Sequence, residues 1–122
     1  MADKKCAAEL IACCFAARTA GHLAHLSTDS YAAHMALGDF YDAIAGAADE
    51  FAECFMGVEG KLRSFPEIEP LGTDPLTWLP ELHTWVTDHR TECAAGNTEL
   101  ANLIDEILAV IDRSSYKLKF LK

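Results

Sequence analysis

The chain has 122 residues, of which 51% are hydrophobic and 24% are charged, and its formal net charge is −9. This length suits one core, so we expect a single domain over residues 1–122. The strong negative charge argues against binding to nucleic acid, although lysines lie near both ends. No stretch offers the roughly 18 uncharged apolar residues that cross a membrane, so we expect no membrane partner.

The N-terminal segment has a basic start followed by an apolar stretch, as a signal peptide does. Glu9 and Arg18 interrupt that stretch, and its apolar pattern continues through residues 22–26 without a turn. We therefore expect no export and a cytoplasmic protein. The five cysteines agree with this interpretation, because an odd number without a C-x-x-C spacing favours reduced thiols over disulfides.

Apolar residues recur at helical spacing in four segments, which predict helices at residues 4–26, 30–57, 76–94 and 98–119. Turn-forming residues at 27–30 predict a tight antiparallel hairpin between the first two helices. About fifteen residues, including Pro66 and Pro70, join the second helix to the third, and so long a connection allows these two to run parallel. The sequence therefore predicts an all-α four-helix bundle with a long crossover.

The expected third helix carries two tryptophans and two histidines. Trp78 and Trp85 are seven residues apart and share a helix face, so we expect them to anchor the core or an interface. His83 and His89 are six residues apart and lie on different faces, and we expect both at the surface.

The other three histidines fall between residues 22 and 34, on both sides of the predicted hairpin turn. At about 100° per residue, Arg18, His22 and His25 fall on the apolar side of the first helix. His34 lies one turn into the second helix, so an antiparallel hairpin brings the three imidazoles to one end of the bundle.

Three carboxylates of the second helix, Asp42, Asp49 and Glu53, fall close together at about 100° per residue. Asp49 and Glu53 are four residues apart and repel each other unless a cation neutralises them. A metal ion would do so, and imidazole with carboxylate suits iron, manganese or zinc. Arg18 is an alternative to the metal ion as the cation that neutralises these carboxylates. A buried arginine without a partner is costly, so Arg18 would pair with one of them.

This pattern resembles the Dps-like mini-ferritins of the ferritin-like superfamily, which have a histidine in the first helix, another near the start of the second, and a later D-x-x-x-E motif. The matching residues are His22, His34, Asp49 and Glu53. The resemblance implies a ferritin-like bundle with a ferroxidase-type iron site, built from the ligands of two chains and hence from at least a dimer. His25 and Asp42 are the alternative or supporting ligands.

The dipeptide Ser30-Tyr31 and the C-terminal sequence IDEILAVIDRSSYKLKFL also resemble small bacteriophage-encoded ferritin-like proteins. That resemblance implies a location in the host cytoplasm.

Two departures from the family leave alternatives open. Gly38 stands where the family usually has another carboxylate, and His25 can align in place of His22 as the ligand on the first helix. A ferritin-like protein that has lost its metal would have this pattern and no cofactor. The alternative function is a cofactor-free helical interaction protein that binds a host or virion protein, with its histidines packed in the bundle.

Overall fold

The structure is a computed structural model that describes residues 2–122. It has four helices in this range: α1 (Ala2–Ser27), α2 (Tyr31–Glu59), α3 (Pro75–Cys93) and α4 (Thr98–Phe120). The predicted all-α four-helix bundle is confirmed. The predicted helix ends differ from the observed ones by at most two residues; for α2, the predicted end is residue 57 and the observed end is Glu59. No helix of this part of the chain is long and apolar enough to span a membrane.

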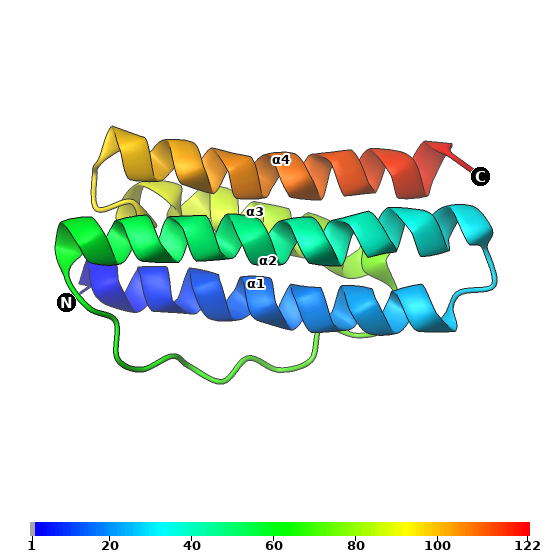
Figure 1. Cartoon of the computed structure of the whole chain (residues 1–122), viewed down its shortest axis with the longest axis horizontal. Coiled ribbons are helices and arrows are strands. Elements are labelled where there is room, and N and C mark those ends of the chain that lie inside the picture. Colours follow the sequence, from blue (N-terminus) through cyan, green and yellow to red (C-terminus); the bar gives the residue numbers. More distant parts are fainter. Residues whose placement is uncertain (1) are drawn as a thin grey trace.

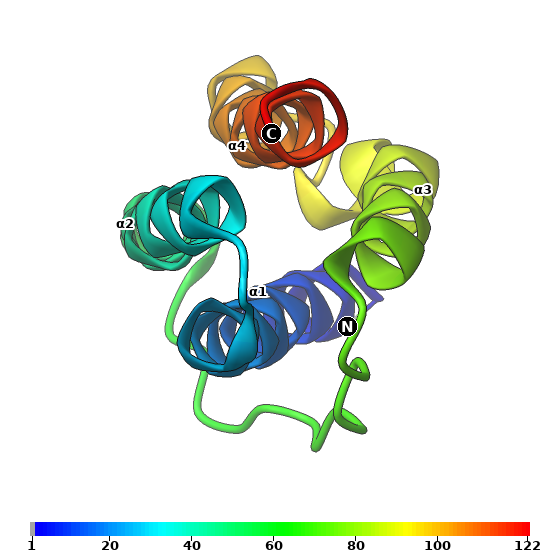
Figure 2. The same cartoon turned by 90° about the vertical axis from the view of Figure 1, so that its right-hand side faces the viewer.

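The long crossover determines the directions of the helices (Figure 1). The corner at residues 28–30 folds α2 back antiparallel to α1, and a short turn does the same for α3 and α4. Between them, residues 60–74 return along the length of the bundle, so α2 and α3 run parallel as predicted. Both α1 and α4 pack against α2 and α3, which places α2 and α3 diagonally opposite each other (Figure 2).

Three helices begin at residues whose side chains cap them. Ser30, Asp74 and Asn97 each adopt an extended backbone and accept a hydrogen bond from a backbone N–H in the first turn of α2, α3 and α4. The N···O distances are 3.1 Å for the Ser30 and Asp74 bonds and 2.8 Å for the shorter of the two at Asn97. These caps satisfy N–H groups that have no partner within the helix, and they fix where each helix starts.

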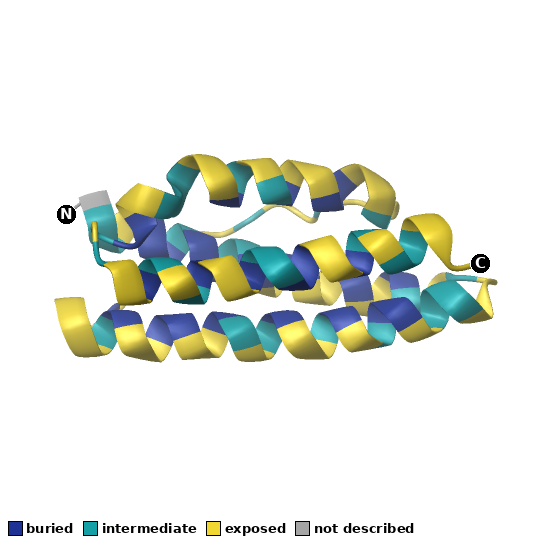
Figure 3. Ribbon diagram, turned by 90° about the horizontal axis from the view of Figure 1, so that it is seen from above, coloured by how far each residue is buried: buried dark blue, intermediate teal, exposed yellow. Residues whose placement is uncertain are grey.

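The core follows the inner sides of all four helices (Figure 3). Its largest aromatic members are Phe40, Phe51, Phe55 and Trp78. Gly21 lets α1 and α2 approach closely here, because a Cβ at this position would lie 2.8 Å from Cδ2 of Phe40. The glycine therefore has a packing role in the middle of the bundle.

A disulfide joins Cys6 of α1 to Cys93 of α3, so the expectation that all five cysteines are reduced is wrong. The start of α1 and the end of α3 lie at the same end of the bundle, where the two Cα atoms are 4.9 Å apart. Cys13, Cys14 and Cys54 are free. Burial, helped by the nearby charge of Glu9, raises the pKa of Cys13 to about 11.

The two histidines of α3 lie at the surface as expected, each partly covered by its neighbours. His89 stacks on Trp85 with ring centroids 4.2 Å apart and donates its Nδ1–H to the Trp85 carbonyl oxygen at 2.8 Å. Nε2 of His83 lies 3.2 Å from a carboxylate oxygen of Asp112 on α4. Trp78 is buried in the core and Trp85 packs against its edge.

Candidate functional site

The three histidines of the α1–α2 corner lie together, as the hairpin predicts. The rings of His25 and His34 stack with their centroids 3.7 Å apart and an interplanar angle of 18°. His22 stacks on Tyr41 at 4.0 Å, and the His25 ring meets the same tyrosine edge-on at 5.4 Å. The corner therefore consists of two stacked pairs of rings from two helices, which meet edge to face.

Two reciprocal hydrogen bonds fix the stacked pair of His25 and His34. Nδ1 of His25 lies 2.6 Å from the backbone oxygen of His34, and Nδ1 of His34 lies 2.8 Å from the backbone oxygen of His25. A carbonyl oxygen only accepts hydrogen bonds, so both Nδ1 atoms must carry the proton. The pair thus ties the last turn of α1 to the first turn of α2.

Gly38 makes room for this arrangement. A Cβ on Gly38 would lie 3.2 Å from Cε1 and 3.3 Å from Nδ1 of His25, closer than most carbon contacts. The position where the family resemblance leads one to expect a carboxylate is therefore covered by the His25 ring.

The three carboxylates do not face the histidine pair. Asp42, Asp49 and Glu53 are all exposed along the outer side of α2. Asp42 shares a surface groove with one of the three histidines, His22. Within residues 2–122, no three side chains of His, Cys, Asp or Glu come close enough to hold a metal ion.

The geometry of the nitrogen donors in the histidine pair also argues against a metal site. Nδ1–H bonded to a backbone carbonyl is the usual support of a metal-bound histidine, and it leaves each Nε2 with its lone pair. These lone pairs lie in the ring planes, and the planes of His25 and His34 are nearly parallel, so they do not point at one ion. The residues of a single chain therefore do not fit a metal site.

Arg18 and His22 are exposed, so the expectation that they face the core is wrong. The buried side of the second half of α1 is formed by Ala17, Ala20 and Ala24 instead. The Arg18 guanidinium lies 5.7 Å from the centre of the Phe15 ring, and no ion pair formed by residues 2–122 includes it. Arg18 does not neutralise the carboxylates of its own chain.

Sequence reasoning missed an apolar surface, which we call the outer α1 face. Its members are Phe15, Leu23 and Leu26 of α1 and Phe65 of the crossover, which are 37%, 62%, 67% and 49% exposed. Tyr31 and Met35 at the start of α2 are also exposed. Only Glu9 and Arg18 carry charge between residues 7 and 26. That near absence of charge was the available signal, because a helix that is apolar all round is normally covered on every side.

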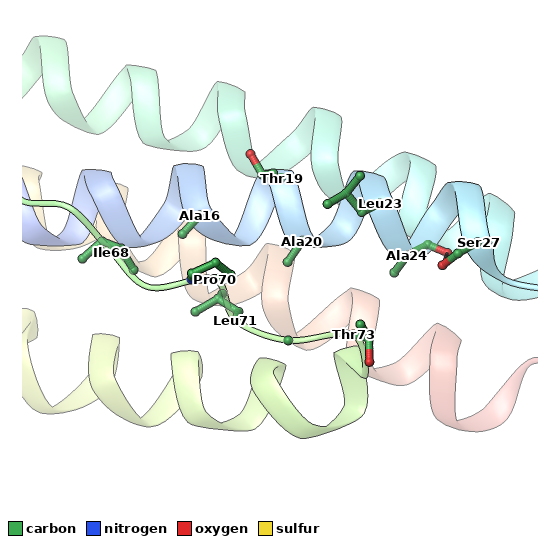
Figure 4. Close-up of a pocket in the computed structure, with 11 residues that line it drawn as sticks. Ala16, Thr19, Ala20, Leu23, Ala24, Ser27, Ile68, Pro70, Leu71 and Thr73 are labelled. Atoms are coloured by element: carbon green, nitrogen blue, oxygen red, sulfur yellow. Dashed lines mark hydrogen bonds between the residues drawn. The ribbon is translucent and has the colours of Figure 1, made fainter.

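A cavity of about 380 Å³ lies beside this face, between α1 and the crossover (Figure 4). Ala16, Ala20 and Ala24 line it on the helix side, and Ile68 and Leu71 are on the crossover side. No charged residue contributes to its lining. The cavity can accept an apolar group and offers only hydroxyl and backbone groups for hydrogen bonds.

These features define a four-helix bundle protein with an interlocked histidine corner, an apolar outer helix face and no metal site within the described chain. Residues 25–118 match DUF5856, a family of unknown function, and the chain belongs to this family. The match begins at His25 and includes His34, so both residues of the interlocked pair lie inside it. No curated protein and no solved structure matches the chain.

Proposed function

We propose that the protein is a cofactor-free helical interaction protein that binds another protein chain through the outer α1 face. The observation that carries the proposal is the exposure of Leu23 and Leu26, each more than half exposed in a stretch of α1, residues 7–26, that has only two charged residues. Leu23 and Leu26 line one groove, and Phe15 and Phe65 line another. Exposed apolar side chains that gather in this way are typical of protein–protein interfaces. Between residues 7 and 26, α1 extends for about 30 Å at 1.5 Å per residue.

The partner that this surface suits first is a second copy of the chain. Two copies with net charges of −9 repel each other over most of their surfaces. The outer α1 face escapes this repulsion, since the charged residue nearest its centre is the positive Arg18. A host or virion protein is the other partner class that the proposal allows.

A symmetric dimer also requires that each copy carry both halves of every contact. Arg18 and Asp42 line the same groove between α1 and α2, next to His22 and Leu26. A two-fold axis along this groove would bring Arg18 of one copy to Asp42 of the other, and the reverse. Arg18, which has no carboxylate partner within the described chain, would thereby acquire one.

Light scattering on the eluate of a size-exclusion column tests the proposal with matched variants. Wild-type protein should have the mass of a dimer or larger assembly at high micromolar concentration. Leu23→Glu should lower the mass to that of one chain, because it places a negative charge from each copy in the apolar contact. Val58→Glu is the control, since Val58 is exposed at the opposite end of the bundle. A wild-type protein that has the mass of one chain at every concentration would contradict self-association.

Iron binding is the second candidate function, with manganese or zinc as other possible metals. It requires ligands from two chains, and the exposed position of His22 next to Asp42 favours it. Asp49 and Glu53 lie further along the same exposed side of α2. Tag-free protein should then contain stoichiometric metal that His22→Ala abolishes. A metal-free protein that takes up no added iron would leave the cofactor-free function.

We also propose a cytoplasmic location, which would be the host cytoplasm if the protein is phage-encoded. The free thiols of Cys13, Cys14 and Cys54 support a reducing compartment, whereas the Cys6–Cys93 disulfide opposes it. Thiols can be alkylated in freshly lysed cells and identified by mass spectrometry, which distinguishes a cytoplasmic from an exported protein. Cys6 and Cys93 should be alkylated in a cytoplasmic protein and protected in an exported one.

A further inference from the structure

A row of three hollows follows the groove between α1 and the crossover. Their volumes are about 790, 420 and 380 Å³, in order from the start of α1 to its end. Ile68 of the crossover lines all three, and Ala16 and Thr19 line both the second and the third. The crossover runs alongside α1 over this length (Figures 1 and 2). The hollows therefore form one groove with two different ends.

Charge distinguishes the two ends of the groove. The hollow near the start of α1 is lined by four cations and two carboxylates: Lys4, Lys5, Lys61, Arg63, Glu9 and Glu67. This is a local excess of positive charge on a chain whose net charge is −9. The other two hollows have no charged residue in their lining. A molecule that has an anionic group at one end and an apolar chain is complementary to a groove with one positively charged end and one uncharged end.

The apolar end of the groove suits a hydrocarbon chain better than a peptide. Its floor is a row of alanines on α1, and Ile68, Pro70 and Leu71 form the opposite wall (Figure 4). A peptide buried here would leave most of its backbone N–H and C=O groups without partners, which is costly. A hydrocarbon chain has no such groups to satisfy.

The crossover that forms one wall is held only by side-chain packing. Among residues 2–122, the backbone hydrogen bonds outside the helices include none formed by residues 61–73. Leu62 is buried, and Ile68 and Leu71 are half-buried against the bundle. Segments with few buried contacts and solvated backbones open at low free energy, so this wall can move aside to admit a ligand.

We propose that this groove binds a single-chain amphiphile with an anionic head group, such as a long-chain carboxylate. The head group lies among Lys4, Lys5, Lys61 and Arg63, and the hydrocarbon chain follows α1 beneath the crossover. The uncharged part of the groove runs from Ala12 to Ser27, which is about 22 Å at 1.5 Å per residue. The proposal needs neither self-association nor a metal. Phe15, Leu23 and Phe65 of the outer α1 face also line the second and third hollows, so a bound hydrocarbon chain and a second copy of the protein would contact the same residues.

Titration calorimetry with dodecanoate below its critical micelle concentration tests the proposal. Wild-type protein should bind one dodecanoate per chain. Ala16→Trp fills the second and third hollows and should weaken binding by about tenfold or more. Ala43→Trp is its control, since Ala43 is exposed on α2. The double variant Lys61→Glu with Arg63→Glu should also weaken binding, whereas Lys119→Glu near the end of α4 should not.

Absence of binding by the wild type would overturn the proposal, and so would binding that both Ala16→Trp and the double charge variant leave unchanged. Circular dichroism shows whether Ala16→Trp folds, and Leu71→Trp fills the same space from the crossover if it does not. A protein that ignores dodecanoate but sediments with vesicles of anionic phospholipid would also overturn it, in favour of a membrane surface as the ligand.

Discussion

His25 and His34 interlock: their rings stack at 3.7 Å, and each ring donates its Nδ1–H to the backbone oxygen of the other residue. The corner between α1 and α2 is thereby fixed by two side chains as well as by its short turn. This relationship gives the histidines a structural role that requires no ion. The functional proposals for the chain consequently rest on its exposed surfaces.

Replacing one member of this pair should destabilise the bundle. His34→Ala removes one partly buried hydrogen bond and the stacking partner of His25, and we expect the free energy of unfolding to fall by about 1–3 kcal/mol. Denaturant unfolding followed by circular dichroism measures the change. His22→Ala is the control, because His22 is exposed and donates no such bond, and its effect should stay within about 0.5 kcal/mol. Equal effects of the two variants would argue against the interlock.

Replacing Gly21 of α1 and Gly46 of α2 by alanine should change the free energy of unfolding in opposite directions. Gly21→Ala places a Cβ 2.8 Å from the Phe40 ring, and the strain should lower the free energy of unfolding by about 1–3 kcal/mol. Gly46→Ala meets no atom within 4 Å and should raise it, by up to about 1 kcal/mol, through helix propensity. Thermal unfolding of both variants gives the two signs. A stabilising Gly21→Ala would show that α1 and α2 can separate freely at this point.

The disulfide should stabilise the fold by closing a long loop. Cys6 and Cys93 are 87 residues apart, and Cys6→Ser should lower the free energy of unfolding by about 2–5 kcal/mol. A reducing agent should destabilise the wild type and leave Cys6→Ser unchanged. Cys54→Ser, at an exposed free cysteine, is the matched control and should behave as the wild type does. Wild-type protein that is indifferent to reduction would mean that the two thiols are not bonded in solution.

The ion pair between α3 and α4 should make stability depend on pH. Arg90 donates two hydrogen bonds to Asp105, at 2.7 and 2.8 Å, and these lower the pKa of the Asp105 carboxyl. A lowered pKa in the folded state stabilises the protein above the pKa of an unfolded aspartate, about 3.9. The gain is lost as the pH falls through the folded value.

Asp105→Asn measures this contribution directly. The stability difference between wild type and variant should be constant from pH 7 to about pH 5 and should shrink below about pH 4. Because the pair is exposed, the difference should be small and should decrease with added salt. A difference that grows in acid would contradict the assigned direction of the pKa shift.

Much of the fold could be predicted because its signals are local. Ser30, Asp74 and Asn97 stand where helix caps are expected, and the long crossover with its prolines predicts parallel second and third helices. The meeting of His25 and His34 also follows from the hairpin alone. Their reciprocal bonds could not be foreseen, because they depend on how closely Gly38 lets the two helices approach.

The expectations that the structure contradicts concern features that depend on packing between distant segments of the chain. Arg18 and His22 were placed inside because a helical wheel assumes one straight buried stripe, whereas the buried side of α1 shifts to Ala20 and Ala24 in its second half. The Cys6–Cys93 pair joins segments 87 residues apart and has no local signal. The outer α1 face has a local signal, its lack of charge, but the same pattern is also typical of a helix side that is buried in a core.

The most direct measurement of the central claim is an isotope-filtered NMR experiment on a mixture of labelled and unlabelled copies of the chain. It detects only contacts between two copies. The claim that the outer α1 face binds a second copy predicts intermolecular contacts from the methyl groups of Leu23 and Leu26. Intermolecular contacts confined to other surfaces, or none in a concentrated sample, would contradict it.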